Sequence, residues 1–491
     1  MIIVVGAYSD LASALLKISS SLGERHGHVE TWVETNMKSF VASEFADFIT
    51  AVQVDQIPSD AKRAVQNSLL DIAGLCVAAR GTDYIAAVRA GWDGEGSCTA
   101  FGHARTIDAA GAALINGTAA HGEDYDDTYE GQPVHTGAVV IPAVIAACER
   151  YGRSGADALL GCVAGMELMC RTALVAPTAI HKAGFHPTAV IGTMGATAGV
   201  GVALGLGATQ LTQALGIAGS MASGIIEYLA EGTWPKRLHP GWSAQCGLRA
   251  ALLGQHGFTG PRSVFEGEHG FFKAFASAEI ERDYAPVTKE LGQTWLMSDI
   301  AFKPYACGTM TQPYIDCAIK LSGTGIALDD IATIVCEVGE GTVHRLWEQA
   351  EEKKKPTTPY SAKFSGPFCI AVGLVDQAAG LEQFTQVKID DPRIIDLASK
   401  VSYRIDPANE YPRNYSGHLR ATMKDGTVHE VKQPHLRGGV REPLSRDELA
   451  RKFEANLTFA NCSPDAMHTL RACCDNLFDA RNLDGLKVFR L

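Results

Sequence analysis

Ala and Gly dominate a run of predicted helices in the first half of this sequence, and this feature constrains the fold most. We predict helices at 107–120, 138–151, 155–175, 188–206, 209–228 and 241–255, and these segments are rich in Ala and Gly. Because their side chains are small, the backbones of such helices can approach one another closely. We therefore predict a core of helix packed on helix in this part of the chain.

One of these helices has the length of a membrane span. Residues 188–207 read TAVIGTMGATAGVGVALGLG. They are mostly Gly, Ala and Thr, whereas membrane spans are rich in Leu and Phe, so we predict a buried helix. The chain starts with MIIVVGAYSDLASALL, and its first lysine is Lys17. This start therefore lacks the basic region that opens a signal peptide.

Charge and cysteine usage narrow the class of protein. The formal net charge is −12, which argues against nucleic acid as a partner because phosphate binding needs clustered Lys and Arg. The 13 cysteines form no CxxC motif, so neither a zinc ribbon nor a Cys-ligated iron–sulfur cluster is indicated. We expect a cytoplasmic protein with no nucleic-acid partner and no membrane partner.

The pattern of the chain changes near residue 300. Strand-like runs occur at 331–341 and 400–406, and Asp425-Gly426 marks a hairpin. The predicted fold is mainly α, with a large all-helical domain and a smaller α+β domain. The predicted division is an N-terminal extension of uncertain order at 1–36, a helical domain at 37–300, an α+β domain at 301–440 and C-terminal helices at 441–491 that rejoin the helical domain.

The most unusual segment is HGEDYDDTYEGQPVHTG at 121–137, which follows a small, apolar helix. Five acids fall within eight residues, between two histidines: Glu123, Asp124, Asp126, Asp127, Glu130, His121 and His135. Four interpretations are open. They are a divalent metal site, a DDxxE motif as in terpene synthases, an acid–base site in which a carboxylate orients a histidine, and a solvated helix end. The spacing fails the calcium-loop pattern, because Tyr129 stands where that loop needs Gly.

Three further stretches combine cations with histidine or tyrosine next to a predicted helix. They contain His181, Lys182 and His186 in IHKAGFHP; Lys236, Arg237 and His239 in WPKRLHPGW; and Lys303 and Tyr305 in FKPYACG. Pro187 opens the next helix. The N-terminus of a helix carries free N–H groups and partial positive charge, which favours an anionic ligand. His181 and His186 are five residues apart and share no helix face, so a zinc site is not indicated. Each stretch is also compatible with an ordinary surface loop or a hinge.

The order of these motifs resembles the MmgE/PrpD family, whose members include 2-methylcitrate dehydratase, cis-aconitate decarboxylase and iminodisuccinate epimerase. The matching stretches are LLDIAGL (69–75), NGTAAHGEDYDDTY…HTGAVVIPA (116–143), GFHPTAVIGTMGA (184–196), WPKRLHPGWSAQCGL (234–248), FKPYACG (302–308), AKFSGPFCIAVGL (362–374) and EPLSRDELARKF (442–453). The resemblance implies a helical domain with a smaller α+β domain over the active site. It also implies a homodimer and catalysis without a metal or an organic cofactor.

The resemblance also implies a set of site residues. Catalytic roles fall to Asp124, His135, His186 and Lys236, and substrate binding falls to Thr128, Lys303, Tyr305 and His239. The lysines offset the negative charge of a polycarboxylate. The two histidines act as acid and base, and Asp124 is expected to orient one of them.

We therefore predict a cofactor-independent lyase that acts on a small di- or tricarboxylate. It resembles 2-methylcitrate dehydratase or cis-aconitate decarboxylase and transfers a proton next to a carboxylate. One alternative is an epimerase or isomerase of a dicarboxylate such as iminodisuccinate, and another is a non-catalytic binding protein. Gly308 stands where some members carry Cys or His, and Phe368 lies near a position where decarboxylating members can carry Tyr. Both departures argue against the decarboxylase.

Overall fold

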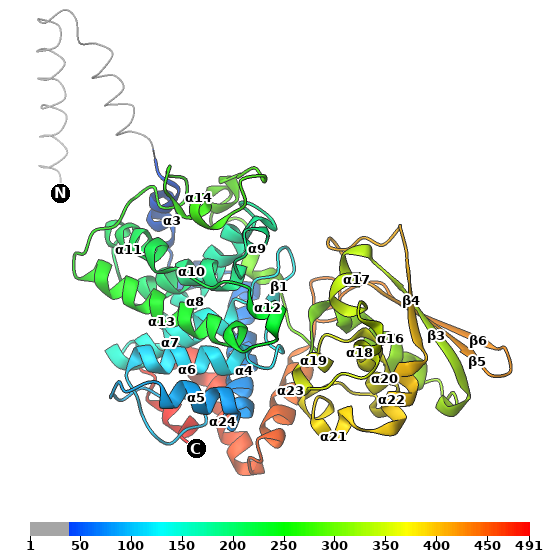
Figure 1. Cartoon of the computed structure of the whole chain (residues 1–491). Coiled ribbons are helices and arrows are strands. Elements are labelled where there is room, and N and C mark those ends of the chain that lie inside the picture. Colours follow the sequence, from blue (N-terminus) through cyan, green and yellow to red (C-terminus); the bar gives the residue numbers. More distant parts are fainter. Residues whose placement is uncertain (1–38) are drawn as a thin grey trace, which may run out of the picture. The chain divides into compact units, whose positions relative to one another are not determined.

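The computed structural model describes residues 39–491, and helices make up most of them (Figure 1). The predicted extension at 1–36 lies outside these residues. The first set of helices is α3 (Val41–Ile49), α4 (Ser59–Ala79), α5 (Asp83–Ala90), α6 (Ala109–His121), α7 (Gly137–Tyr151), α8 (Gly155–Ala173), α9 (Ala179–Lys182), α10 (Pro187–Ala203), α11 (Ala208–Met221), α12 (Tyr228–Glu231), α13 (Pro235–Gln255), α14 (Phe271–Phe275) and α15 (Ala285–Thr288). These helices, together with the C-terminal helices α23 (Arg446–Phe459) and α24 (Pro464–Asn476), form what we call the helical lobe.

Glycines allow the helices of this lobe to pack at short range, as predicted. A Cβ added to Gly161 of α8 would lie 2.5 Å from the backbone oxygen of Gly199 in α10. A Cβ on Gly241 of α13 would lie 2.1 Å from the backbone oxygen of Leu114 in α6. No side chain larger than hydrogen fits at either crossing, so glycine fixes how closely α6, α8, α10 and α13 approach.

Helix α13 begins earlier than we predicted. It starts at Pro235 rather than at 241, so Lys236, Arg237 and His239 lie in its first turns and not in a preceding loop. The physical reason is that Pro235 occupies the first helical position, where a missing N–H costs nothing. Pro240 lies one turn further in, where a helix tolerates it less well. The cationic segment therefore has the fixed geometry of a helix.

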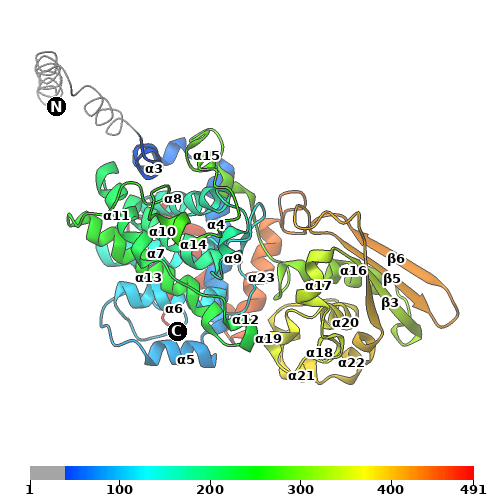
Figure 2. The same ribbon diagram turned by 45° about the horizontal axis from the view of Figure 1, so that its top comes forward.

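The rest of the chain forms a mixed lobe around a four-stranded sheet. Its elements are α16 (Gln312–Ser322), β3 (Ile331–Val338), α17 (Glu340–Leu346), α18 (Ala350–Lys354), α19 (Pro359–Ala362), α20 (Gly366–Asp376), α21 (Gln386–Ile389), α22 (Pro392–Ser399), β4 (Val401–Ile405), β5 (Gly417–Met423) and β6 (Val428–Gln433). The strand order is β4-β3-β5-β6, with β3 and β4 parallel and the other pairs antiparallel. Figure 2 shows α16 and α20 on one face of this sheet. The predicted strands and the hairpin at Asp425-Gly426 are confirmed.

Each lobe has its own hydrophobic core. One cluster of buried side chains runs through the helical lobe and includes residues of α23 and α24. The second joins the inner face of the sheet to α16, α20 and α22. The predicted mainly α fold with a smaller α+β part is confirmed, whereas the boundaries at 300 and 440 stay a prediction. Within residues 39–491, no helix is both long enough and apolar enough to cross a membrane.

We predict that Gly241→Ala lowers the free energy of unfolding by about 2 kcal/mol, because the new methyl group must push α13 away from α6. Urea denaturation of the two proteins measures this change. Gly81→Ala is the matched control, since nothing lies within 4 Å of its added Cβ. It should stay within about 0.5 kcal/mol of the parent protein. Equal stability of both variants would contradict the close crossing of α6 and α13.

Candidate active site

The acidic segment is buried between α6 and α7, so the interpretation as a solvated helix end is wrong. All of α6 is buried, down to His121 at its last position. Residues Thr128–Tyr129 then form a short strand, β1, which pairs with β2 at Ile300–Ala301. Asp124, Asp126 and Asp127 expose 3% or less of their surface. This segment therefore needs a polar partner for each charge.

Each of the five acids has its own partner. Glu123 bonds Lys363 and Tyr84; Asp124 bonds Lys236 and Lys303; Asp126 bonds His121 and His135; Asp127 bonds Ser68 and the Gly137 amide; and Glu130 accepts from the Val440 amide. The partners come from both lobes. The segment is thus a junction of ion pairs, and the charge run has a structural explanation that differs at each position.

Asp124 lies at the centre of two buried ion pairs. Its carboxylate contacts the ammonium groups of Lys236 and Lys303, and the distance between Lys303 Nζ and Asp124 Oδ1 is 2.7 Å. Lys303 Nζ also donates to the backbone oxygen of Asp124 at 2.9 Å. Burial alone would raise the pKa of Asp124, but the two lysines hold it well below 3.8. Two cations share one anion, which leaves this trio with a net positive charge.

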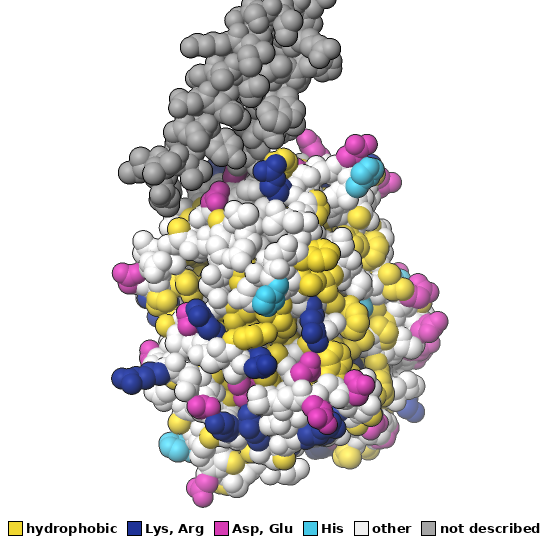
Figure 3. Space-filling view, turned by 90° about the vertical axis from the view of Figure 1, so that its left-hand side faces the viewer, with side chains coloured by type: hydrophobic (Ala, Val, Ile, Leu, Met, Phe, Trp, Pro, Cys, Tyr) yellow, Lys and Arg dark blue, Asp and Glu magenta, His cyan; other side chains and the backbone are white. Residues whose placement is uncertain are grey.

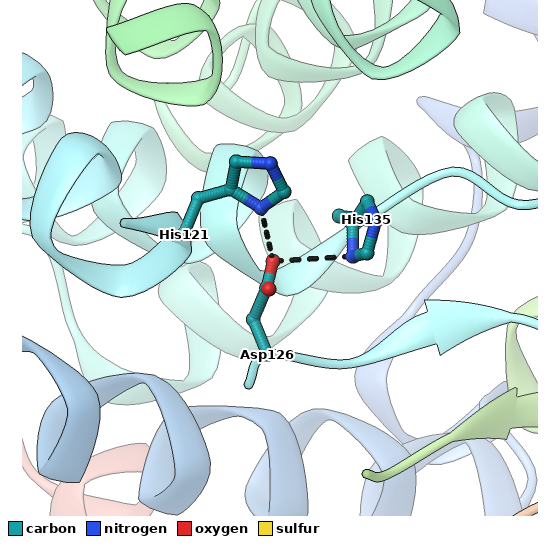
Figure 4. A group of neighbouring side chains, drawn as sticks. All are labelled: His121, Asp126 and His135. Carbon is teal, nitrogen blue, oxygen red and sulfur yellow. Dashed lines mark hydrogen bonds and ion pairs between the residues drawn. The ribbon is translucent and has the colours of Figure 1, made fainter. Parts of the chain in front are cut away.

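Asp126, and not Asp124, is the carboxylate that contacts the histidines (Figure 4). Its Oδ2 lies 2.9 Å from His121 Nδ1 and 3.3 Å from His135 Nδ1. We expected Asp124 to orient a histidine. The structure corrects this assignment, because the two lysines occupy the Asp124 carboxylate. The φ angle of 56° at Asp124 places it in the left-handed region.

Four histidines form a contiguous cluster around this carboxylate. The ring centre of His121 lies 4.6 Å from that of His135 and 5.8 Å from that of His186. His186 Nδ1 lies 3.1 Å from His239 Nδ1. His186 caps the start of α10 and His239 belongs to the first turns of α13. The structure thus brings the predicted residues His135, His186 and His239 together.

The electrostatics of the cluster keep several imidazoles neutral at pH 7. Burial lowers the pKa of His121 to about 4, partly offset by Asp126. Burial, His121, His239 and Lys236 hold the pKa of His186 well below 6.5. Burial also lowers the pKa of His239 to about 4. Added negative charge, such as a polyanionic ligand, would favour protonation of these rings.

Several buried polar atoms in the segment have no hydrogen-bond partner among the described residues. They are His121 Nε2, Asp126 Oδ1, Thr128 Oγ1 and Thr136 Oγ1. A buried polar atom without a partner costs about 1–3 kcal/mol, and such atoms are uncommon in native proteins. Their concentration between His121 and Thr136 indicates a place that a polar ligand or water completes.

The three side chains of Figure 4 also have the composition of a metal site, since His121, Asp126 and His135 place one ligand atom each within 4.8 Å of the others. The detailed geometry favours hydrogen bonds. His135 Nδ1 lies 2.7 Å from the backbone oxygen of Asp127, so this nitrogen carries a proton and cannot also bind a cation. A net positive charge on the nearby Asp124–lysine trio opposes a further cation. The absence of a metal stays a prediction.

Tyr305 is the predicted site residue that the structure places elsewhere. Its hydroxyl donates to Asp316 Oδ1 at 2.7 Å. It lines a cavity of about 850 Å³ together with Tyr125, Arg437 and Lys452, and none of the four histidines lines that cavity. Lys303 and Tyr305 are two residues apart in the FKPYACG motif. Lys303 contacts Asp124 beside the cluster, whereas Tyr305 belongs to the mixed lobe.

Sequence reasoning missed several residues of the site. His121 and Asp126 lie within the acidic segment and were not assigned roles. Lys363 is 1% exposed and bonds both the backbone oxygen and the carboxylate of Glu123, each at 2.7 Å. It belongs to the AKFSGP stretch (362–367), so its position in a stretch that matches the family could have identified it as a site residue. Arg237 lies between the rings of Tyr84 and Tyr360, which places the mixed lobe beside the start of α13.

Comparison with known proteins gives two matches that together cover most of the chain. Residues 43–283 match the MmgE/PrpD N-terminal domain, and residues 305–474 match the MmgE/PrpD C-terminal domain. The resemblance inferred from the motifs is therefore confirmed.

Individual relatives align over most of their length. Cis-aconitate decarboxylase from Aspergillus terreus is 28% identical over 86% of this chain and 90% of its own length. Cis-aconitate decarboxylase from Homo sapiens is 30% identical over 76% of this chain and 78% of its own. The protein of that name from Mus musculus is 27% identical over 92% and 93%.

We predict that Asp124→Asn lowers the free energy of unfolding by about 3 kcal/mol at pH 7, because it leaves two buried lysines without their anion. Because the folded-state pKa of Asp124 is depressed, its stabilising effect is present above pH 3.8 and is lost as the pH falls further. The difference between variant and parent should therefore shrink below about pH 4. Urea denaturation at several pH values measures it.

The control is Asp329→Asn, since Asp329 is exposed. Its stability should stay within about 0.5 kcal/mol of the parent at every pH. A difference for Asp124→Asn that is small at pH 7, or that grows on acidification, would contradict the ion-pair assignment.

Proposed function

The chain belongs to the MmgE/PrpD family and is a lyase, and from this premise we propose that it decarboxylates cis-aconitate or a tricarboxylate of the same shape. The observation that carries the proposal is that buried positive charge in excess of the negative charge occurs in the same site as polar atoms without a partner. Lys236 and Lys303 share one carboxylate, and His121 Nε2 and Thr128 Oγ1 lack a partner among the described residues. A polycarboxylate supplies both the missing charge and the missing acceptors.

The names of the relatives support decarboxylation over dehydration. Phe368, which suggested otherwise, is 1% exposed and packs on Phe384 in the core of the mixed lobe. Site residues such as Lys303 are buried to a similar degree, so the departure at Phe368 still argues against decarboxylation. Gly308 faces the ring of Phe364, which an added Cβ would approach to 3.1 Å. A larger residue there would require Phe364 to move, so glycine at this position has a packing reason.

The proposed reaction breaks one carbon–carbon bond and forms one carbon–hydrogen bond. The bond between a carboxylate carbon and its neighbour breaks, and CO2 leaves. The electron pair left behind is delocalised through the double bond towards a second carboxylate, where Lys236 and Lys303 stabilise it. An imidazolium of the histidine cluster then donates a proton to the carbon next to that second carboxylate, and the double bond moves by one position. Each turnover thus consumes one proton, which the protein regains from solvent.

We predict that the protein releases CO2 from cis-aconitate in D2O and places one deuterium on the carbon of the product that receives the proton. Proton NMR follows the reaction, with 2-methylcitrate, citrate and iminodisuccinate as further candidate substrates and with EDTA-treated protein. Loss of water from 2-methylcitrate without CO2 release would make the enzyme a dehydratase. Deuterium exchange with inversion at a stereocentre and no elimination would make it an epimerase. Either result would overturn the proposed decarboxylation.

We predict that His186→Ala and Lys236→Ala each lower kcat/KM by at least about a hundredfold, the size expected for loss of an acid–base or charge-stabilising group. Initial rates with the best substrate measure the effect. His256→Ala is the matched control at the far end of α13, where His256 is exposed, and it should retain the parent rate. Near-parent activity in both site variants would reject the site.

A homodimer is part of the same proposal. Figure 3 shows hydrophobic side chains gathered on one face of the helical lobe, with Lys and Arg among them. On α13, Trp242 and Leu253 are each 40% exposed. Large apolar groups at the surface are typical of a protein–protein contact. A second copy of the chain is the partner that the family resemblance implies. A cytoplasmic location is proposed on the ground of cysteine usage.

A further inference from the structure

Within residues 39–491, the polar contacts of the Asp126 side chain are with two histidines, His121 and His135. Its carboxylate is completely buried, and Figure 4 shows it between His121 and His135. Burial alone would raise the pKa of Asp126, but the charges and hydrogen bonds of the two histidines lower it well below 3.8. Asp126 therefore stays ionised inside the protein, with imidazole N–H groups as its partners.

Among the described residues, the lysines near Asp126 are each paired with another carboxylate. The titratable groups that face the triad are Asp71 of α4, Lys452 of α23, Lys236 and His239 of α13, His186 of α10, and Asp124 and Asp127 of the same segment. Lys452 pairs with Asp71 at 2.7 Å, and Lys236 pairs with Asp124. Burial and Asp126 raise the pKa of Asp127 to about 7. The negative charge of Asp126 is thus available to a protonated imidazole.

The same contacts fix the tautomers of two rings. An ionised carboxylate only accepts hydrogen bonds, so His121 must direct Nδ1–H at Asp126. His135 Nδ1 lies near two acceptors, the backbone oxygen of Asp127 at 2.7 Å and Asp126 Oδ2 at 3.3 Å. It must carry a proton as well. In both rings Nε2 is then the nitrogen left free to take up and release a proton.

We propose that Asp126 is a positioning residue that holds His121 and His135 in the Nδ1–H tautomer and stabilises the imidazolium from which a proton leaves through Nε2. This inference rests on the proposed function, because it assigns the source of the proton that decarboxylation consumes. The His135 imidazolium gives its Nε2 proton to the delocalised carbanion, at the carbon next to the second carboxylate, and returns to the neutral ring. Its Nδ1–H remains on Asp127 O and Asp126 throughout, and Nε2 regains a proton from solvent.

The test is Asp126→Asn, which keeps the size of the side chain and an oxygen acceptor but removes the charge. Without the anion, the protonated ring loses a charge that stabilises it. Because the reaction needs the protonated ring, the pH profile of kcat should move to lower pH by at least about one unit. At pH 7.5 kcat should fall about tenfold or more, with partial recovery at pH 5.5 and little change in KM. A merely structural role would not produce this recovery on acidification.

Asp127→Asn is the matched control in the same segment. Its carboxyl bonds Ser68 and the Gly137 amide rather than an imidazole. The pH profile of this variant should move much less than that of Asp126→Asn. An unshifted profile in Asp126→Asn, or an equal shift in both variants, would overturn the inference.

NMR of 13C- and 15N-histidine-labelled parent protein supplies a readout that does not depend on turnover or on folding of a variant. We expect His121 and His135 as Nδ1–H tautomers at pH 7. The Nε2–H tautomer at either ring would overturn the inference, as would stoichiometric Zn²⁺ binding at these rings that raises activity. If the parent protein turns over no substrate but shows these tautomers, the proposed function fails while the positioning by Asp126 stands.

Discussion

The buried contact of Asp124 with Lys236 and Lys303 is the interaction on which the arrangement of the site depends. One lysine comes from the first turns of α13, and the other lies at the junction between the helical lobe and the mixed lobe. Buried ion pairs add little stability compared with apolar packing, because each charge loses its hydration. They do fix geometry, since a lone charge cannot be left in the interior. This trio holds a net positive charge beside the histidines, where a polyanion compensates it.

The close packing of small residues explains why the histidines meet. His121 ends α6, His186 caps α10, His239 lies at the start of α13, and His135 precedes α7. Gly241 lets α13 approach α6, so helix ends that are distant in the sequence converge. The apolar helix α6 and the acidic segment after it therefore contribute to the same site. The helices exclude water from the site, and the segment after α6 supplies its charged side chains.

Much of this could be predicted from the sequence. Runs of small apolar residues predicted α6, α7, α8 and α10 to within a few residues, and α6 and α10 are buried on all sides rather than on one face. Motif position brought most of the site residues to the cluster. The sequence could not tell which acid meets a histidine. Asp124 and Asp126 lie two residues apart, and their roles follow from the left-handed turn at Asp124 and from lysines that lie more than a hundred residues away.

Two other misassignments have the same origin. Tyr305 was assigned to substrate binding together with Lys303, but its hydroxyl donates to Asp316 in the mixed lobe. Lys363 received no role, although it belongs to a matching motif, because its partner Glu123 is 240 residues away. Contacts between distant segments depend on tertiary packing, which periodicity does not encode. The residue types at the site were readable from the sequence, and their pairing was not.

The most direct test of this account is a crystal structure with propane-1,2,3-tricarboxylate, a saturated analogue that has the charge of the proposed substrate and no double bond. The account predicts carboxylates of the ligand on Lys236, Lys303 and Thr128, with a histidine of the cluster in hydrogen-bond contact. A ligand bound instead in the cavity lined by Arg437 and Arg451, with both lysines still engaged only by Asp124, would contradict it.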